Sequence, residues 1–267
     1  MSAIAVPIAF QTRLVRAEVV KGLRLMWRRR SLVIAATIVY GLTYLGISLF
    51  IGGGHLVKDL MVRTVPALLA VVFANIAVEG TAGIAEEINA GTLEQTRLSP
   101  ASPQVQALGR MTALGIEGLA AAIVLGIVFV FGVGLDINPH AATVVPAVLT
   151  ILDALGYGLI MTALVVRVAS IGAISHVGSM AIMAFGGMLV PISVFPHGLE
   201  IFARFIPTTL GVESVNTTLA GHELGAAWSD GTLPWLLVHT AVVVAAGFSL
   251  YAINIRHAQR EGGLSPR

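Results

Sequence analysis

Hydrophobic residues in this sequence gather into six long runs, separated by short polar, proline-containing or glycine-rich segments. A run of about 18 uncharged apolar residues is long enough to cross a bilayer as a helix, and several of these runs approach or exceed that length. Lipid offers no hydrogen-bond partners to the backbone, so all six must be helical, and the alternating pattern of a β-barrel is absent. The predicted spans cover residues 31–51, about 61–85, about 104–135, about 141–166, about 169–195 and 232–255.

Residues 8–30 precede the first span and show a different pattern. Apolar residues such as Val19, Leu23 and Trp27 recur at three- and four-residue spacing, with basic residues mostly on the opposite side. A basic amphipathic helix of this kind lies in the membrane interface. The alternative is a positive flank that only assists insertion of the first span.

Residues 196–220 are too polar to form a span, and Pro196, Pro207 and Gly211 interrupt them. The pattern fits two half-helices, about 198–205 and about 208–219, that dip into the outer leaflet. Non-helical backbone at that depth requires packing against protein or water. An ordinary extracellular loop with a surface helix is the alternative.

The composition agrees with a membrane protein. Only 11% of the 267 residues are charged, 56% are hydrophobic, and the mean hydropathy is +0.89, whereas soluble domains carry about 25% charged residues. The chain has no cysteine, which excludes disulfides and thiolate metal sites. We therefore expect an all-α integral membrane protein with a single transmembrane domain over residues 1–267.

The basic residues predict its orientation. With six spans, thirteen of the sixteen Lys and Arg residues fall on the side that carries both termini and residues 86–103. The other side carries only Lys58, Arg63 and Arg204. Because positive residues concentrate on the cytoplasmic side, we expect that side to be cytoplasmic and the protein to lie in the plasma (inner) membrane.

The segment 86–103, EEINAGTLEQTRLSPASP, is a compact polar stretch between two hydrophobic runs. Gly91 suits the C-terminal end of the preceding helix, and Thr92 with Gln95 three residues later suits the start of a short new one. Pro103 begins the third span at a position that a helix tolerates. The short helix presents apolar and charged side chains to a partner: Leu93, Glu94, Arg97 and Leu98. The alternative is a solvated loop that only connects two spans.

From about residue 8 to 255, this order of elements resembles the permease subunits of ABC-2 type transporters. The most specific match is the run EINAGTLEQ at residues 87–95, followed by Ser-Pro at 99–100 and 102–103, which is similar to the intracellular coupling loop of that family and closer to its drug-exporter branch. The resemblance implies an ATPase (nucleotide-binding) subunit at the cytoplasmic face and a second permease chain, identical or related, alongside membrane lipid. The residues that it assigns to ATPase coupling are Glu87, Gly91, Thr92, Leu93, Glu94, Gln95 and Arg97.

The chain itself lacks the ATP-binding loop of such machines. A Walker A loop needs a lysine directly after a glycine, and neither Lys21 nor Lys58 follows one. We therefore expect no enzyme activity in this chain and expect MgATP to bind the partner subunit. No His and carboxylate residues have metal-ligand spacing, so we expect no cofactor, metal or nucleic acid on this chain.

Ionisable residues inside spans are costly and usually functional. Asn75 and Glu79 share one face of the second span, and Asp153 lies near the middle of the fourth. Asp153 meets a basic group, is protonated or faces a wet cavity; we favour a hydrogen bond between helices, and the same role for His176 and His239. The candidates for a pathway or gate are Asn75, Glu79, Asp153, Phe195, Phe202 and Phe205.

The leading hypothesis is the permease of an ABC exporter that moves a hydrophobic drug or lipid outward. Export of lipid-linked polysaccharide is an alternative within the same family. A second class is a transporter driven by an ion gradient, with Asp153, Glu117 and Glu79 as coupling residues, but the expected internal repeat is not found. A membrane-embedded enzyme is the weakest alternative, since the corresponding signatures are absent.

Overall fold

The computed structural model describes residues 8–89, 102–167, 171–189 and 191–260, and these residues form helices and turns without a β-strand. The helices are α1 (Ile8–Arg28), α2 (Arg30–Ile51), α3 (Lys58–Asn89), α5 (Pro103–Ile127), α6 (Ala141–Arg167), α7 (Ile171–Phe185), α8 (His197–Ala203), α9 (Thr209–Gly221), α10 (Leu224–Ser229) and α11 (Thr232–Arg260). A π-helical turn η1 (Val128–Gly132) extends α5, and a 3₁₀ turn η2 (Ile192–Val194) precedes α8.

Five helices in the described part of the chain are long and apolar enough to cross a membrane. They are Arg30–Ile51, Lys58–Gly80, Gln104–Gly132, Ala141–Arg167 and Thr232–His257. The prediction of an all-α integral membrane protein is confirmed. The predicted starts and ends agree well at the first span, which stops at Ile51 before Gly53 and Gly54 turn the chain with positive φ.

The predicted fifth span, 169–195, corresponds to the shorter helix α7, which ends at Phe185. Gly186 and Gly187 follow, and Gly187 has a φ of +78°, a left-handed conformation that ends a helix. The predicted boundary at residue 195 is therefore wrong, while the crossing itself stays a prediction. Helix α3 continues to Asn89, past the predicted end of the second span near residue 85, in line with the expectation that this helix ends close to Gly91.

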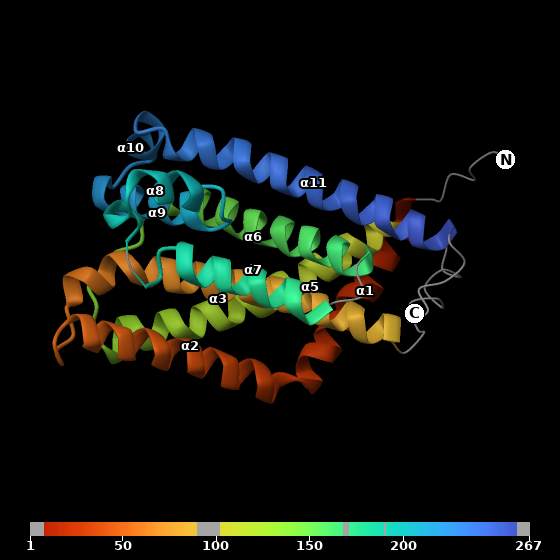
Figure 1. Cartoon of the computed structure of the whole chain (residues 1–267), viewed down its shortest axis with the longest axis horizontal. Coiled ribbons are helices and arrows are strands. Elements are labelled where there is room, and N and C mark those ends of the chain that lie inside the picture. Colours follow the sequence, from red (N-terminus) through yellow and green to blue (C-terminus); the bar gives the residue numbers. More distant parts are fainter. Residues whose placement is uncertain (1–7, 90–101, 168–170, 190, 261–267) are drawn as a thin grey trace.

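The long helices run side by side along the longest axis of the molecule (Figure 1). One end of this bundle carries α8, α9 and α10, and we call it the α9 end; the opposite end carries α1, and we call it the α1 end (Figure 1). The α3 span is 72% buried, against 22% for α2 and 28% for α11. The core is therefore built around α3, with α6 as its main neighbour and α2 and α11 near the edges.

Small residues allow α6 to approach two helices closely. A Cβ on Gly158 would lie 2.7 Å from the carbonyl oxygen of Ala77 in α3. A Cβ on Gly156 would lie 3.0 Å from the backbone of Val244 in α11. Such contacts matter in membranes, where the hydrophobic effect between helices is weak and close packing provides much of the association energy.

The N-terminal amphipathic helix is present as α1, and the chain turns at Arg29 before α2 begins. Instead of lying against lipid alone, α1 packs along α5. Gly22 of α1 lies against Ala113, and Gly109 of α5 lies against Glu18, in both cases with no room for an added side chain. The start of α5 has the predicted form, since Ser102 caps the helix by accepting the N–H of Val105 and Pro103 occupies its first turn.

Candidate functional site

Residues 205–208 connect α8 to α9, and we call them the joint. A buried acidic side chain holds this joint against the middle of the bundle. Asp153 lies near the midpoint of α6 and is 1% exposed. Its Oδ2 accepts the backbone N–H of Thr208 at 3.4 Å, and its Oδ1 lies 2.8 Å from Nδ1 of His239 in α11. One carboxylate therefore joins α6, α11 and the segment that enters α9.

The imidazole of His239 adds a second contact to the same joint, since it also lies close to the backbone of Phe205. Two non-helical residues of the joint thus find partners on membrane-spanning helices. This is the packing that non-helical backbone needs if it lies at membrane depth. The predicted interhelical hydrogen bond of Asp153 is confirmed, and its partner is the histidine for which the same role is predicted.

Thr208 occupies an unusual backbone conformation at the centre of the joint. Its φ is 88°, in the left-handed region that a β-branched residue rarely adopts, and it is 1% exposed. The next residue, Thr209, donates its hydroxyl hydrogen to the carbonyl of Phe185 at 3.2 Å. Gly186 packs against the Thr208 side chain. The end of α7 is therefore fixed to the same joint.

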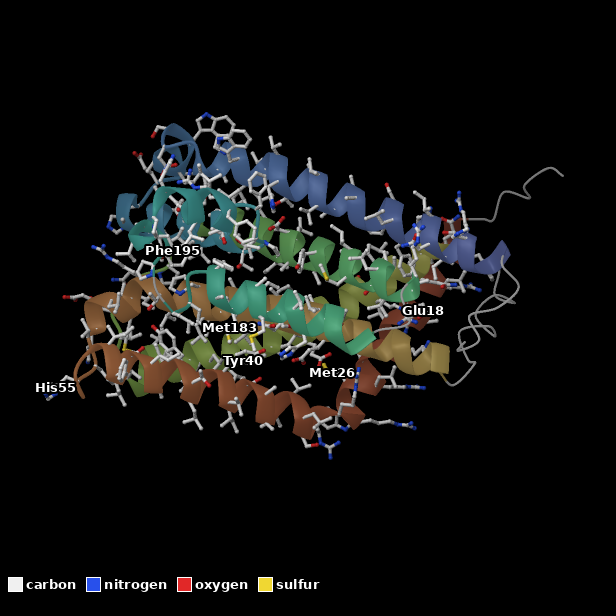
Figure 2. All side chains as sticks on the ribbon, viewed as in Figure 1. Glu18, Met26, Tyr40, His55, Met183 and Phe195 are labelled. Atoms are coloured by element: carbon white, nitrogen blue, oxygen red, sulfur yellow. The ribbon has the colours of Figure 1, made fainter. Side chains whose placement is uncertain are left out.

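Aromatic side chains cover the joint near the end of α7. The ring of Phe185 meets that of Phe202 edge-on with a centroid separation of 5.2 Å, and that of Phe195 at 6.3 Å. Phe195 lies toward the α9 end, while Glu18 lies at the opposite, α1 end (Figure 2). Two of the three predicted phenylalanines are thus brought together. Phe205 is 71% exposed and stays outside this cluster.

Phe185 was not among the predicted residues. The signal that points to it is its place directly before Gly186 and Gly187, where a helix is expected to end.

Arg204 connects the two helices of the pair. Its guanidinium lies 3.0 Å from a carboxylate oxygen of Glu200 in α8 and 3.5 Å from one of Glu213 in α9. Burial raises the pKa of the Glu213 carboxyl, and the nearby Arg204 partly offsets that rise. The predicted helical pair in 196–220 is therefore present as α8 and α9. Its depth in the membrane stays a prediction.

The remaining pathway candidates lie elsewhere in the bundle. Asn75 is 1% exposed, and its amide donates to the carbonyl of Val71 at 2.9 Å. Glu79, one turn later, is exposed and lies within electrostatic range of Arg29 at the α1 end. Among the described residues no hydrogen bond or ion pair joins either of them to Asp153, so they do not form one cluster with it.

Of the predicted coupling residues, only Glu87 is among the described residues. Glu87 belongs to the last turns of α3, but Gly91, Thr92, Leu93, Glu94, Gln95 and Arg97 lie outside the described residues. What the structure does place are the two helices that this segment joins. The described residues contain no group of three or more His, Asp or Glu side chains arranged to hold a metal ion.

The sequence model of one protein family, described as ABC-2 type transporter, matches residues 13–219. The match covers most of α1 through α9 and includes the segment between α3 and α5. This chain belongs to the ABC-2 type transporter family. A comparison with curated proteins finds no match.

As an ABC-2 permease, the chain is the transmembrane component of a transporter and a multi-pass membrane protein. It is not the catalytic ATPase of such a system. The family match ends within α9, so α10 and α11 lie beyond it. Asp153 and the joint at Phe205–Thr208 lie inside the matched region, whereas the partner His239 does not.

Proposed function

We propose that this ABC-2 permease exports a hydrophobic drug or lipid across the plasma membrane and is driven by a separate ATPase subunit. Two permease chains, identical or related, pair in the membrane, and each binds one ATPase that carries MgATP. Both termini and residues 86–103 face the cytoplasm. The family match over residues 13–219 and the similarity of EINAGTLEQ to a coupling loop support this proposal.

The observation that carries the coupling step is the position of the helices on either side of residues 90–101. This segment joins α3 to α5 (Figure 1). Helix α3 is the most buried of the candidate spans and packs against α5, α6, α7 and α9. A displacement of the segment by the ATPase would therefore move the most buried of the candidate spans.

In this proposal Glu94 and Arg97 form the polar contacts with the ATPase, and Leu93 forms the apolar contact. Gly91, Thr92 and Gln95 shape the short helix, and Glu87 connects it to α3. The substrate pathway and gate involve Asn75, Glu79, Asp153, Phe195, Phe202 and Phe205. The tie between Asp153 and the α8–α9 joint supports a gate there, since movement of α6 or α11 would act directly on the joint.

Co-purification with ATPase activity tests the proposal. Wild type and a Gly91→Pro/Glu94→Arg variant are isolated in mild detergent from the cells that normally produce the protein, and ATPase activity of the eluate is measured. We expect wild type to retain an ATPase subunit. We expect the ATPase activity in the eluate of the variant to be at least tenfold lower than in that of wild type. The matched control is Glu223→Arg, the same charge reversal at an exposed residue between α9 and α10.

Equal ATPase recovery with wild type and the double variant would contradict the coupling role of this segment. A folded wild-type chain that carries no ATPase and transports in response to an ion gradient would contradict the proposal as a whole.

A further inference from the structure

An apolar cavity of about 590 Å³ lies between α3, α5, α6 and α9. Its walls include Phe73 of α3, Gly126 of α5, Ala147 of α6 and Val212 of α9. Ile127 and Phe131 also line it and are 53% and 80% exposed, so the cavity opens onto the lateral surface of the bundle. The volume falls within the range of about 300–1,000 Å³ that is typical of ligand pockets.

The opening lies on a surface that the candidate spans would present to membrane hydrocarbon. Three of the four walls belong to helices that are long and apolar enough to span the membrane. All of the lining side chains are apolar except Thr143 and Thr150, and none is charged. The cavity is therefore open to lipid and has no feature that would hold an ion or a charged ligand.

Both threonine hydroxyls already donate hydrogen bonds to backbone carbonyls, either within α6 or just before its start. The Thr143 hydroxyl donates to the carbonyl of His140 at 2.7 Å, and the Thr150 hydroxyl donates to the carbonyl of Pro146 at 2.6 Å. Neither hydroxyl has a hydrogen left for a ligand. A ligand with polar groups would lose hydration in the cavity without gaining donors, which is costly. The chemistry therefore favours a ligand segment made only of hydrocarbon.

The cavity becomes polar at one rim. Pro139 and Leu219 line it near the start of α6 and the end of α9. Just beyond them, the imidazoles of His140 and His222 hydrogen-bond each other from the two walls. An apolar cavity with a polar rim matches a molecule with a hydrocarbon chain and a polar headgroup.

We propose that this cavity binds one acyl chain of a membrane lipid, with the headgroup at the rim formed by His140 and His222. The inference goes beyond the proposed function, because chain binding requires neither an ATPase nor transport. The bound chain contacts α9 at Val212, and α9 begins at the joint that Asp153 holds. A lipid chain in the cavity therefore contacts the same helix, α9, whose start is held by the joint.

Photo-crosslinking tests the site in the purified, full-length chain reconstituted in phosphatidylcholine vesicles. The probe is a phosphatidylcholine that carries a diazirine near the end of one acyl chain, and crosslinked residues are mapped by mass spectrometry. Val212 is 5% exposed, so a probe reaches it only by entering the cavity. Ile38 of α2 is 54% exposed and reports contact with bulk lipid.

Filling the cavity provides the decisive comparison. A Cβ at Gly126 would meet only Leu69 within 4 Å, at 3.6 Å, so Gly126→Phe extends a ring into the cavity. The matched control is Gly46→Phe in α2, where an added Cβ meets nothing within 4 Å. We expect crosslinks at Val212 in wild type and Gly46→Phe, at least a tenfold loss in Gly126→Phe, and equal crosslinks at Ile38 in all three. If Gly126→Phe does not fold, Ala147→Phe fills the cavity from the α6 wall.

Equal crosslinking at Val212 in the filled and control variants would overturn the proposal. Crosslinks at Ile38 without any at Val212 in wild type would overturn it as well. Efficient disulfide formation between two copies of an Ile123→Cys variant in the membrane would instead make this face an interface between chains. No ATPase is present in these assays, so their outcome is independent of the proposed function.

Discussion

At the scale of single residues, the Asp153 carboxylate connects segments that are far apart in the chain. Replacing it by alanine leaves the N–H of Thr208 and Nδ1 of His239 without their buried partner. Hydrogen bonds of this kind in membranes contribute about 1–2 kcal/mol, and loss of one member of a buried pair costs more. We expect Asp153→Ala to lower the melting temperature in mild detergent by roughly 5 °C.

The control for this prediction is Asp136→Ala, which removes an exposed carboxylate that accepts a hydrogen bond from the side-chain amide of Asn138. We expect it to leave the melting temperature within about 1–2 °C of wild type, since exposed substitutions have small effects. The double variant Asp153→Ala/His239→Ala is expected to lose less than the sum of the two single changes, because both remove the same contact. Full additivity would argue that the pair does not interact in solution.

The sequence could predict that Asp153 needs a hydrogen-bond partner, because a lone carboxylate inside a span is too costly. It could not predict the pairing. His239 lies 86 positions later, and the second partner is the backbone N–H of Thr208, which no side-chain pattern indicates. The phenylalanine cluster follows the same logic, since Phe185 joins Phe195 and Phe202 only once α7 ends and the chain turns back.

Thr208 itself permits a test of backbone strain. At a φ of 88° its Cβ is unfavourable, and its buried hydroxyl oxygen has no hydrogen-bond partner among the described residues. Strained conformations of this type cost about 1–3 kcal/mol. We expect Thr208→Gly to raise the melting temperature by a few degrees, because glycine accepts this φ and keeps the N–H that Asp153 binds.

Thr208→Ala separates strain from loss of the side chain, because alanine removes the hydroxyl and methyl groups but keeps the Cβ. It is expected to be no more stable than wild type. If alanine stabilised the protein as much as glycine, the gain would come from removing the hydroxyl, and the strain argument would be wrong.

At the scale of secondary-structure elements, the close approach of α6 to its neighbours depends on glycines. A leucine at Gly158 would collide with the backbone of Ala77 in α3, and backbone cannot move aside as a flexible side chain can. Overpacking of this kind typically costs about 1–3 kcal/mol. We expect Gly158→Leu to lower the melting temperature by roughly 5 °C or to prevent folding. Gly46→Leu in α2, which has open space, is the matched control and is expected to behave like wild type.

Element types were predictable because apolar length and spacing depend only on local sequence. The amphipathic pattern of residues 8–30 predicted α1, and Pro207 predicted the division between α8 and α9. The end of α7 was missed because Met188 and Leu189 continue the apolar run beyond Gly186 and Gly187. The contact of α1 with α5 was missed because the pattern identifies an apolar face but not the helix that covers it.

At the scale of the whole molecule, the two ends of the bundle carry different elements. The last turns of α3 and the start of α5 lie at the α1 end, whereas helices α8 and α9 lie at the α9 end (Figure 1). The buried helix α3 connects these regions. This separation suits a machine in which force arrives at one end and a pathway opens at the other, provided that the two ends face opposite sides of the membrane.

Cysteine labelling in intact cells tests that arrangement, and the natural chain has no cysteine to interfere. We expect His55→Cys, His197→Cys and Glu223→Cys to react with a membrane-impermeant maleimide added from outside, since all three positions are exposed. His55 lies toward the α9 end (Figure 2), His197 begins α8, and Glu223 lies between α9 and α10. Arg97→Cys and Ala169→Cys are expected to react only after permeabilisation. The positions 169 and 197 flank α7, so opposite reactivity would establish that this short helix crosses the membrane and that the chain has six spans. Reaction of both from the same side would show that α7 does not cross the membrane. Labelling of Arg97→Cys from outside would show that the orientation is the opposite of the predicted one, and that residues 86–103 are out of reach of a cytoplasmic ATPase.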